Sequence, residues 1–508
     1  MTSPIRLLAL FLILFGIALR LSNQFGEPRL WLDELFSVAV AESPTWDVIL
    51  TTLRFDTHPP LYYLQLHVWS LFGQSDFWYL LNSLGWSLLA LWVMYTTVNR
   101  LYGETAGLWS TAIFAVLPLE VFFAENVRMY AFLAVQQIIL WGLLEAQIRS
   151  QRADARRYVL LALVAVAITL SHGLGFLIVF FCFLQAGVRE ITRHGAPRLI
   201  PLALSCVPAV LSSAWPLVIG SFRKTEGIAN FDLREVGIHL TLTTVGMEFP
   251  EPVLAGFVVF TLIAFICLGV SRAFAQFVWL VLLPFALLLV LSVMAKPVFI
   301  YRTMGLFLPY LAIALGLAAD EILARGTLPR RLAFYAILGV MAASGANSTW
   351  HFEKDGYRAA VNAWEQSSDP DALVVLDHPV DLWALQRYLS EGARVSALEI
   401  QPPVRDGMLR LRQRLENTPL ERIGFFGHAD TRVIGRRTLT FVATPEQVAK
   451  REVVWVMNPQ DDCNALNALL GQNETTTREA ERTARFEAAE RVSAQGKTFL
   501  ACRIRGAR

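Results

Sequence analysis

Two adjacent acids, Asp33 and Glu34, stand among large apolar side chains directly after the first apolar segment of the chain. If this stretch is a helix, Leu32, Leu35 and Phe36 share one apolar face, which is typical of a helix that lies on a bilayer surface. Successive helical residues diverge by about 100°, so we expect Asp33 at the edge of that face and Glu34 pointing away from it. Asp33 is then placed to meet a group that emerges from the lipid, although both acids are equally compatible with solvating a surface helix.

A second candidate group lies in residues 56–63, just before the chain re-enters the membrane region. The two prolines at 59–60 have fixed φ angles, and a residue that precedes proline is confined to extended conformations. His58 is therefore expected to present its ring from a rigid turn, and Tyr62 follows in the same motif. The prolines also fit a simpler role as the start of a helix, in which case His58 is structural.

A third group, Glu125, Arg128 and Tyr130, falls within the stretch 119–130. On a helix, Glu125 and Arg128 are i, i+3 neighbours, so the two charges can pair with each other. The alternative is that they face a substrate. His172 lies at a turn between two apolar spans and is a further candidate contact, with a structural role as the open alternative.

Two cations, Lys296 and Arg302, stand late in the chain in a short loop between apolar segments. Long cationic side chains at such positions reach the lipid headgroups without forming a specific site. This loop, however, lies on the less basic side of the membrane. A lipid phosphate or pyrophosphate needs cations at headgroup depth, and an arginine such as Arg302 binds two phosphate oxygens at once.

The composition indicates a polytopic α-helical membrane protein. Of 508 residues, 55% are hydrophobic and 17% are charged, and the mean hydropathy is +0.46. Apolar runs of about 17–25 residues suffice to cross a bilayer, and the formal net charge of +2 gives no sign of a nucleic-acid partner. We expect about 11 transmembrane helices, at residues 5–21, 77–98, 106–119, 129–148, 158–170, 174–188, 199–220, 253–270, 274–295, 303–319 and 332–346, the fifth and sixth of which could instead form one re-entrant pair.

Arginines gather in alternate loops of this arrangement, for example in residues 149–157 and 325–331. By the positive-inside rule these loops are cytoplasmic. We therefore expect a multi-pass inner-membrane protein whose candidate site lies at the periplasmic or extracellular face. The loops that then face outward are 22–76, 120–128, 221–252 and 295–302, together with the tail.

Residues 347–508 differ in composition from the membrane module 1–346 and predict a soluble α/β domain on the same outer side. This part contains no Gly-rich phosphate-binding loop. It carries Cys463 and Cys502, and an oxidising compartment allows such a pair to form a disulfide. We expect strands at 372–376, 394–400, 422–426, 438–442, 453–456 and 497–503, and helices at 381–389, 407–415 and 464–470.

Together these segments resemble the GT-C class of membrane glycosyltransferases, specifically the bacterial relatives of protein O-mannosyltransferases (family 39) and of the lipid A aminoarabinose transferase. The resemblance covers residues 5–319 and rests on four motifs in order: WLDE at 31–34, HPPLYY at 58–63, ENVRMY at 125–130 and KPVFIYR at 296–302. The chain has His58 as the O-mannosyltransferases do, where the aminoarabinose transferase has lysine. The tail does not resemble the β-trefoil domain of eukaryotic O-mannosyltransferases.

The resemblance implies transfer of a sugar from a polyprenyl-phosphate donor to an acceptor on the outer face of the membrane. The family's catalytic aspartate corresponds to Asp33. This residue would act as general base in an inverting transfer to a hydroxyl or amine. The cations near its lipid phosphate correspond to Arg128 and Arg302, and less closely to Lys296. No cofactor is required, although carboxylates such as Asp33 and Glu125 also suit a divalent cation. The acceptor would be a glycan, a lipid or a protein.

Two other classes of protein fit parts of the pattern. A transporter or flippase of lipid-linked saccharides would place ionisable residues within its spans and tend toward internal repeats, and the sequence shows neither feature. A membrane-anchored binding protein would use the spans only to hold the tail. Deleting the tail separates these readings, because a binding protein would lose all function, whereas an enzyme would keep the residues of its chemistry.

Overall fold

In the computed structural model the chain divides into two units, one of residues 1–28 and 51–353 and one of residues 29–50 and 354–508. The structure describes residues 3–22, 30–43, 45, 48–49, 52, 58–214, 232–294, 298–346, 357–367, 373–376, 387–388, 394–399, 432–434, 437–441, 453–457, 486–494 and 497–504.

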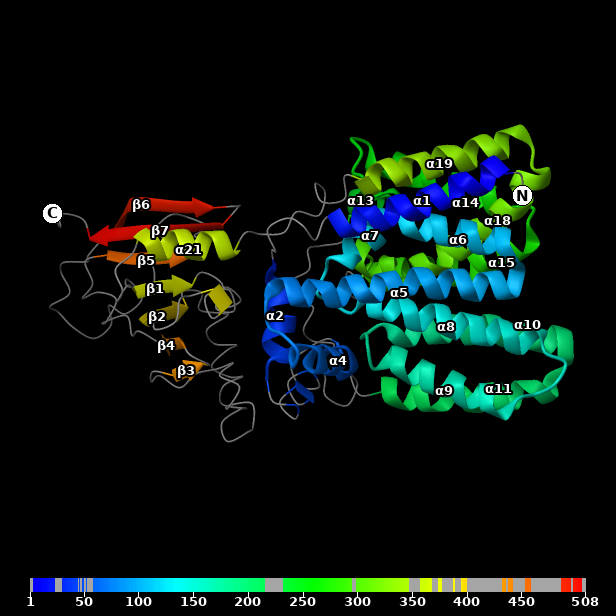
Figure 1. Cartoon of the computed structure of the whole chain (residues 1–508), viewed down its shortest axis with the longest axis horizontal. Coiled ribbons are helices and arrows are strands. Elements are labelled where there is room, and N and C mark those ends of the chain that lie inside the picture. The colour runs from blue at the N-terminus through cyan, green and yellow to red at the C-terminus, as the bar shows by residue number, and fades with distance from the viewer. Residues whose placement is uncertain are drawn as a thin grey trace. The chain divides into compact units, whose positions relative to one another are not determined.

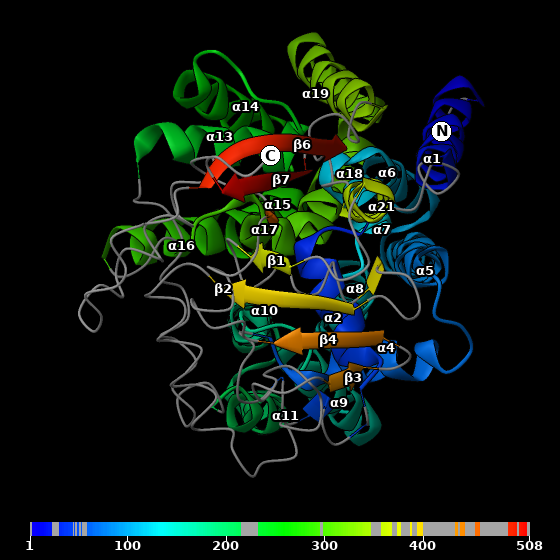
Figure 2. The same ribbon diagram turned by 90° about the vertical axis from the view of Figure 1, so that its left-hand side faces the viewer.

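The first unit is a bundle of apolar helices that run side by side (Figure 1), several of which Figure 2 views nearly end-on. Among the described residues, 7 helices are long and apolar enough to cross a membrane, and a bent pair raises the number to 8. A helix lies within every predicted span, so the predicted polytopic helical fold is confirmed. The helices are α1 (Ser3–Ser22), α4 (Pro60–Ser70), α5 (Asp76–Tyr102), α6 (Glu104–Val116), α7 (Pro118–Ala124), α8 (Tyr130–Arg149), α9 (Ala155–Thr169), α10 (Gly175–His194), α11 (Leu199–Ser213), α13 (Leu233–Val245), α14 (Pro252–Cys267), α15 (Ser271–Phe277), α16 (Leu283–Met294), α17 (Tyr301–Met304), α18 (Leu308–Arg325) and α19 (Leu328–Ala346).

Large apolar side chains remain exposed on the outer faces of these helices. On α1, for example, Leu7, Phe11 and Leu14 are all exposed. A soluble protein rarely leaves such a continuous apolar surface in water. The exposed faces therefore belong against lipid, and the polar residues inside the bundle must satisfy one another.

The predicted span 106–119 is not one straight helix. It is broken between α6 and α7, whose axes differ by 70°. The break lies at Leu117, directly before Pro118. Proline has no N–H with which to continue the helical hydrogen bonds, and its ring clashes with the preceding turn, so a break at this point is the expected physical result.

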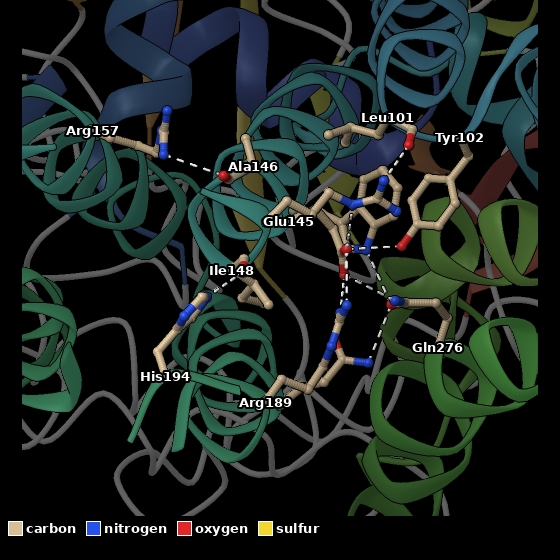
Figure 3. Close-up of polar contacts among 12 residues, drawn as sticks. Leu101, Tyr102, Glu145, Ala146, Ile148, Arg157, Arg189, His194 and Gln276 are labelled. Atoms are coloured by element: carbon tan, nitrogen blue, oxygen red, sulfur yellow. Dashed lines mark hydrogen bonds and ion pairs between the residues drawn. The ribbon is translucent and has the colours of Figure 1, made fainter. Parts of the chain in front are cut away.

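A buried polar network ties four helices together at the end of the bundle that carries the basic loops (Figure 3). Its centre is Glu145 of α8, which is 1% exposed. The carboxylate accepts from Tyr102 of α5 at 2.8 Å, from Gln276 of α15 at 3.1 Å and from Nη2 of Arg189 of α10 at 3.1 Å. A buried network whose members are satisfied fixes the relative positions of the elements that carry it.

Replacing Glu145 by alanine should lower the free energy of unfolding by about 2–3 kcal/mol. This is less than the roughly 3–5 kcal/mol lost when one partner of a fully buried ion pair is removed, because the Arg189 side chain is 30% exposed. The matched control is Asp320→Ala, which removes the surface pair with Arg272 and should cost at most about 1 kcal/mol. Denaturation of both variants in detergent checks this, and equal losses would contradict it.

The described residues of the second unit include a mixed seven-stranded sheet in the order β3-β4-β2-β1-β5-β7-β6 (Figure 1). Its central strands β4, β2, β1 and β5 pair in parallel with one another. At the two edges the pairs are antiparallel: β3 with β4, β7 with β5, and β6 with β7. This confirms the predicted α/β character of the tail. The elements are α2 (Leu32–Ala41), α21 (Tyr357–Ser367), β1 (Leu373–Leu376), β2 (Arg394–Glu399), β3 (Arg432–Ile434), β4 (Arg437–Phe441), β5 (Val453–Met457), β6 (Phe486–Ala494) and β7 (Lys497–Ile504).

Five of the predicted strands match β1, β2, β4, β5 and β7. The strand β6 was not predicted, because its sequence FEAAERVSA is rich in residues that favour a helix. Its long pairing with β7, with a register shift between Ala488 and Glu490, decides its conformation instead. The predicted strand at 422–426 and the three predicted helices lie outside the described residues, except that 387–388 are helical.

The cysteines divide between the two units. Cys182, Cys206 and Cys267 of the helical bundle are free thiols. In the second unit, Cys502 is buried and disulfide-bonded. The partner that we predicted for it, Cys463, lies outside the described residues.

Candidate functional site

Four segments of the first unit converge beside the start of α4. The turn at His58 contacts the turn 170–174 between α9 and α10: the Leu61 N–H donates to the carbonyl of Leu170 at 2.9 Å. The N–H of Gly173 faces Nδ1 of His58 at 3.5 Å. The segments 125–129 and 298–302 bring two arginines close enough to His58 to act on its charge. Residues from three of the four motifs, together with the turn that carries His172, therefore meet at one place.

Two histidines form the centre of this cluster. The ring centroids of His58 and His172 are 4.6 Å apart, and Nδ1 of His172 accepts the N–H of Leu174 at 3.0 Å. Because Nδ1 accepts in each ring, the hydrogen bonds assign the proton of the neutral imidazole to Nε2. Burial, followed by the positive charges of Arg128 and Arg302, lowers the pKa of His58 well below 6.5. His58 is therefore neutral at pH 7 and offers an Nε2–H donor.

Two guanidinium groups give the cluster its positive charge. Arg128 is 7% exposed, and its Nη1 donates to the hydroxyl of Tyr63 at 3.2 Å. The Nε of Arg302 donates to the hydroxyl of Tyr301 at 3.1 Å, and the guanidinium lies 5.6 Å from the centre of the same ring. Two planar cations beside a neutral histidine make an electropositive site that suits a phosphate group.

Tyrosines line the cluster, but not all of them are those singled out in the sequence. Tyr130 stacks on Phe123 with centroids 4.2 Å apart and borders His172 at 6.1 Å. Tyr62 is 1% exposed and packs edge-on against Tyr63. Tyr63 and Tyr301, whose hydroxyls accept from Arg128 and Arg302, were not among the residues singled out. Their positions in the sequence could have pointed to them, because each of these two tyrosines stands directly next to a residue that was singled out as a site candidate.

The segment that carries Arg128 is a tight turn, so Glu125 and Arg128 are not i, i+3 neighbours on one helix, which was the arrangement considered for a pairing of their charges. Helix α7 ends at Ala124, and α8 begins only at Tyr130. Between them the Arg128 N–H donates to the carbonyl of Asn126 at 2.7 Å, and the Ser83 hydroxyl donates to the same carbonyl at 2.7 Å. The turn, rather than a helix face, therefore sets the position of the guanidinium.

The acidic pair begins α2, in the second unit. Glu34 was expected to point away from the apolar face, but it is 0% exposed. Its Oε2 accepts the N–H of Trp31 at 3.0 Å, because the first N–H groups of a helix need acceptors. Asp33 is partly exposed, and the Ser37 hydroxyl donates to its backbone carbonyl at 2.9 Å. The roles of both acids in the chemistry stay predictions.

Two further predictions concern Lys296 and a metal ion. Lys296 lies outside the described residues. Within the part of the chain that the structure describes, no group of three or more His, Cys, Asp or Glu side chains could hold a metal ion. The divalent cation considered for Asp33 and Glu125 therefore stays a prediction.

The lowered pKa of His58 predicts a pH-dependent stability. Between the folded pKa and about 6.5, the unfolded chain binds more protons than the folded one, so His58 makes the protein lose stability as the pH falls through this window, by up to about 1.4 kcal/mol per pH unit. Above pH 7 its contribution is constant. Comparing denaturation of wild type and His58→Gln from pH 7.5 to 5 measures this. Parallel curves for the two proteins would contradict it.

No family model and no curated protein matches the chain. The crystal structure of ArnT from Cupriavidus metallidurans in the apo state matches with a TM-score of 0.56 at 15% identity, over 96% of this chain and 97% of that chain. This chain has the GT-C fold. ArnT bound to undecaprenyl phosphate matches with a TM-score of 0.53 at 14% identity, over 98% of both chains. An oligosaccharyltransferase from Archaeoglobus fulgidus matches at 0.45 and 12% identity, over 77% of this chain and 62% of that chain. Because the likeness to ArnT is nearly full-length, the GT-C resemblance extends beyond the helical bundle.

Proposed function

We propose that the protein is a glycosyltransferase that moves a sugar from a polyprenyl-phosphate donor to an acceptor hydroxyl or amine. The observation that carries this proposal is the pair of arginines, Arg128 and Arg302, beside the neutral His58 in a bundle with the GT-C fold. A phosphate at headgroup depth needs such cations. That ArnT has been solved with undecaprenyl phosphate supports a polyprenyl phosphate as the carrier.

An apolar cavity supports a lipid-linked donor. It has a volume of about 360 Å³ and lies between α9, α10, α11 and α16, where its lining includes Leu177, Phe180, Val210 and Leu287. It also includes Thr169, at the end of α9 that leads into the turn with His172. Phe180 and Val210 are exposed on the surface that faces lipid, so part of a prenyl chain would enter this cavity from the bilayer while its phosphate lies near the histidine and arginine cluster.

In the proposed reaction Asp33 acts as general base. It takes the proton of the acceptor hydroxyl or amine as that group attacks the anomeric carbon, and the bond from the anomeric carbon to the phosphate oxygen breaks on the opposite side. The anomeric centre is therefore inverted. Polyprenyl phosphate is a good leaving group that needs no general acid, and Arg128 and Arg302 stabilise the negative charge that develops on it. Glu34, Glu125 and His58 would orient the donor or acceptor.

We place this chemistry at the outer face of the cytoplasmic membrane. The support is the distribution of arginine, which gathers in the loops opposite to the candidate site and so marks those loops as cytoplasmic. The same orientation puts the disulfide-bonded Cys502 in an oxidising compartment. Hexose and pentose donors both fit this proposal, as do glycan, lipid and protein acceptors.

The test uses the purified protein in nanodiscs with a panel of polyprenyl-phosphate sugars, with and without candidate acceptors. We expect release of polyprenyl phosphate from at least one donor, and transfer of its sugar when the matching acceptor is present. Absence of release from every donor and acceptor pair would contradict the proposal. Movement of the intact donor across the membrane, without cleavage, would identify a flippase instead.

A further inference from the structure

The break between α6 and α7 leaves backbone groups without their usual partners. The last carbonyls of a helix have no intrahelical donor. Here the residue that would bond to the carbonyl of Phe114 is Pro118, which has no N–H. The break lies inside an apolar bundle, where α7 is buried throughout. These carbonyls must therefore receive donors from elsewhere in the protein.

Arg20 of α1 supplies these donors. Its side chain is 0% exposed. The Nη2 donates to the carbonyl of Phe114 at 3.2 Å, and Nη1 donates both to the carbonyl of Ala115 and, at 3.0 Å, to that of Gly16 in its own helix. The Nε donates to the hydroxyl of Ser87 on α5 at 2.9 Å. One guanidinium thus joins α1 and α5 to the end of α6.

Two neighbouring residues, Gly16 and Glu120, help to fix the position of the Arg20 side chain. A Cβ at Gly16 would collide with the carbonyl of Ala115, so glycine allows α1 to approach α6 closely, and the two helices pack along each other (Figure 1). Glu120, in the first turn of α7, is 3% exposed and lies close enough to Arg20 for the two groups to interact electrostatically. Arg20 therefore contacts the end of α6 by hydrogen bonds and lies close to the start of α7.

We propose that Arg20 is a positioning residue for the turn 125–129 and so for Arg128. Helix α7 has only 7 residues and leads directly from the break into that turn. With a rise of about 1.5 Å per residue, a change of about 10° at the break would move the far end of α7 by roughly 2 Å. The importance of this movement for substrate rests on the proposed function, in which Arg128 binds the donor phosphate.

The test compares Arg20→Lys with Arg20→Met and uses two readouts. Lysine keeps the positive charge but lacks the planar set of donors that reaches several acceptors at once, whereas methionine removes the charge as well. We expect hydrogen exchange in the peptide 118–130 to rise by about tenfold in Arg20→Lys, and the Kd for undecaprenyl phosphate to rise by about tenfold. Because Arg20 acts through Arg128, adding Arg128→Gln should weaken binding by less than the product of the single effects.

The matched control is Glu145→Gln, which weakens a buried network at the opposite end of the bundle. A general loss of stability would alter exchange and binding in this control as well, whereas positioning predicts changes in the Arg20 variants alone. Wild-type exchange in 118–130 for both Arg20 variants would overturn the proposal. If wild-type protein fails to bind undecaprenyl phosphate, the proposed function fails, and the exchange measurement still decides the role of Arg20.

Discussion

Asp33→Asn should lower the rate of sugar transfer by about 10²–10⁴-fold, the usual contribution of a general base, while leaving the fold intact. Asparagine has nearly the same size and shape as aspartate but cannot take the acceptor proton. Asp33 is partly exposed, and its backbone carbonyl, which accepts the Ser37 hydroxyl, is unchanged by the substitution. Single-turnover transfer with a fixed donor and acceptor measures the rate, and binding of undecaprenyl phosphate should stay within about twofold.

The control for this variant is Asp154→Asn. Asp154 precedes α9 on the basic side of the bundle, and its carboxylate accepts the N–H of Arg156 at 3.1 Å. Asparagine caps a helix as well as aspartate does, so transfer should be unchanged. Wild-type transfer by Asp33→Asn would remove this acid from the chemistry. Loss of transfer together with loss of donor binding would instead give Asp33 a binding role.

The membrane architecture was predictable because it depends on local properties. A run of apolar residues long enough to cross a bilayer is visible without knowledge of its neighbours, and every predicted span contains a helix. The exception is the predicted span 106–119, which the structure breaks into two helices. The bend of 70° between α6 and α7 needs Pro118, which is visible, and Arg20, which lies far away in the sequence and satisfies the carbonyls at the end of α6.

The candidate site was predictable in its residue types but not in its assembly. Charged and histidine side chains at the ends of apolar spans are conspicuous, which is why His58, Arg128 and Arg302 were selected. Their convergence depends on the packing of helices, such as the contact between His58 and Gly173, which are 115 residues apart. Glu34 was expected to point away from the apolar face. Its carboxylate is buried instead, because it accepts the N–H of Trp31 at the start of α2.

Loss of either cluster arginine should weaken donor binding strongly. A hydrogen bond to a charged group contributes about 1.5–3 kcal/mol, so Arg128→Gln and Arg302→Gln should each raise the Kd for undecaprenyl phosphate by about 10–100-fold. The same charges stabilise the leaving phosphate, so kcat should fall as well. Because both guanidinium groups act on one phosphate, the double variant should lose less than the product of the two single effects. Titration in nanodiscs measures the Kd, and transfer at saturating donor measures kcat.

Arg325→Gln is the control for charge alone, because Arg325 is exposed at the end of α18 on the basic side of the bundle. Its binding should match wild type at physiological salt, where exposed charges are screened beyond about 8 Å.

Arg128→Gln and Arg302→Gln should also change the pH dependence of stability that His58 causes. The two guanidinium charges lower the pKa of His58, so removing either one should raise it. The window between this pKa and about 6.5 then narrows, and the total loss of stability on acidification becomes smaller. An unchanged pH profile in Arg128→Gln and Arg302→Gln would show that the arginines and His58 do not share one electrostatic site, and the phosphate site proposed here would then lose its main support.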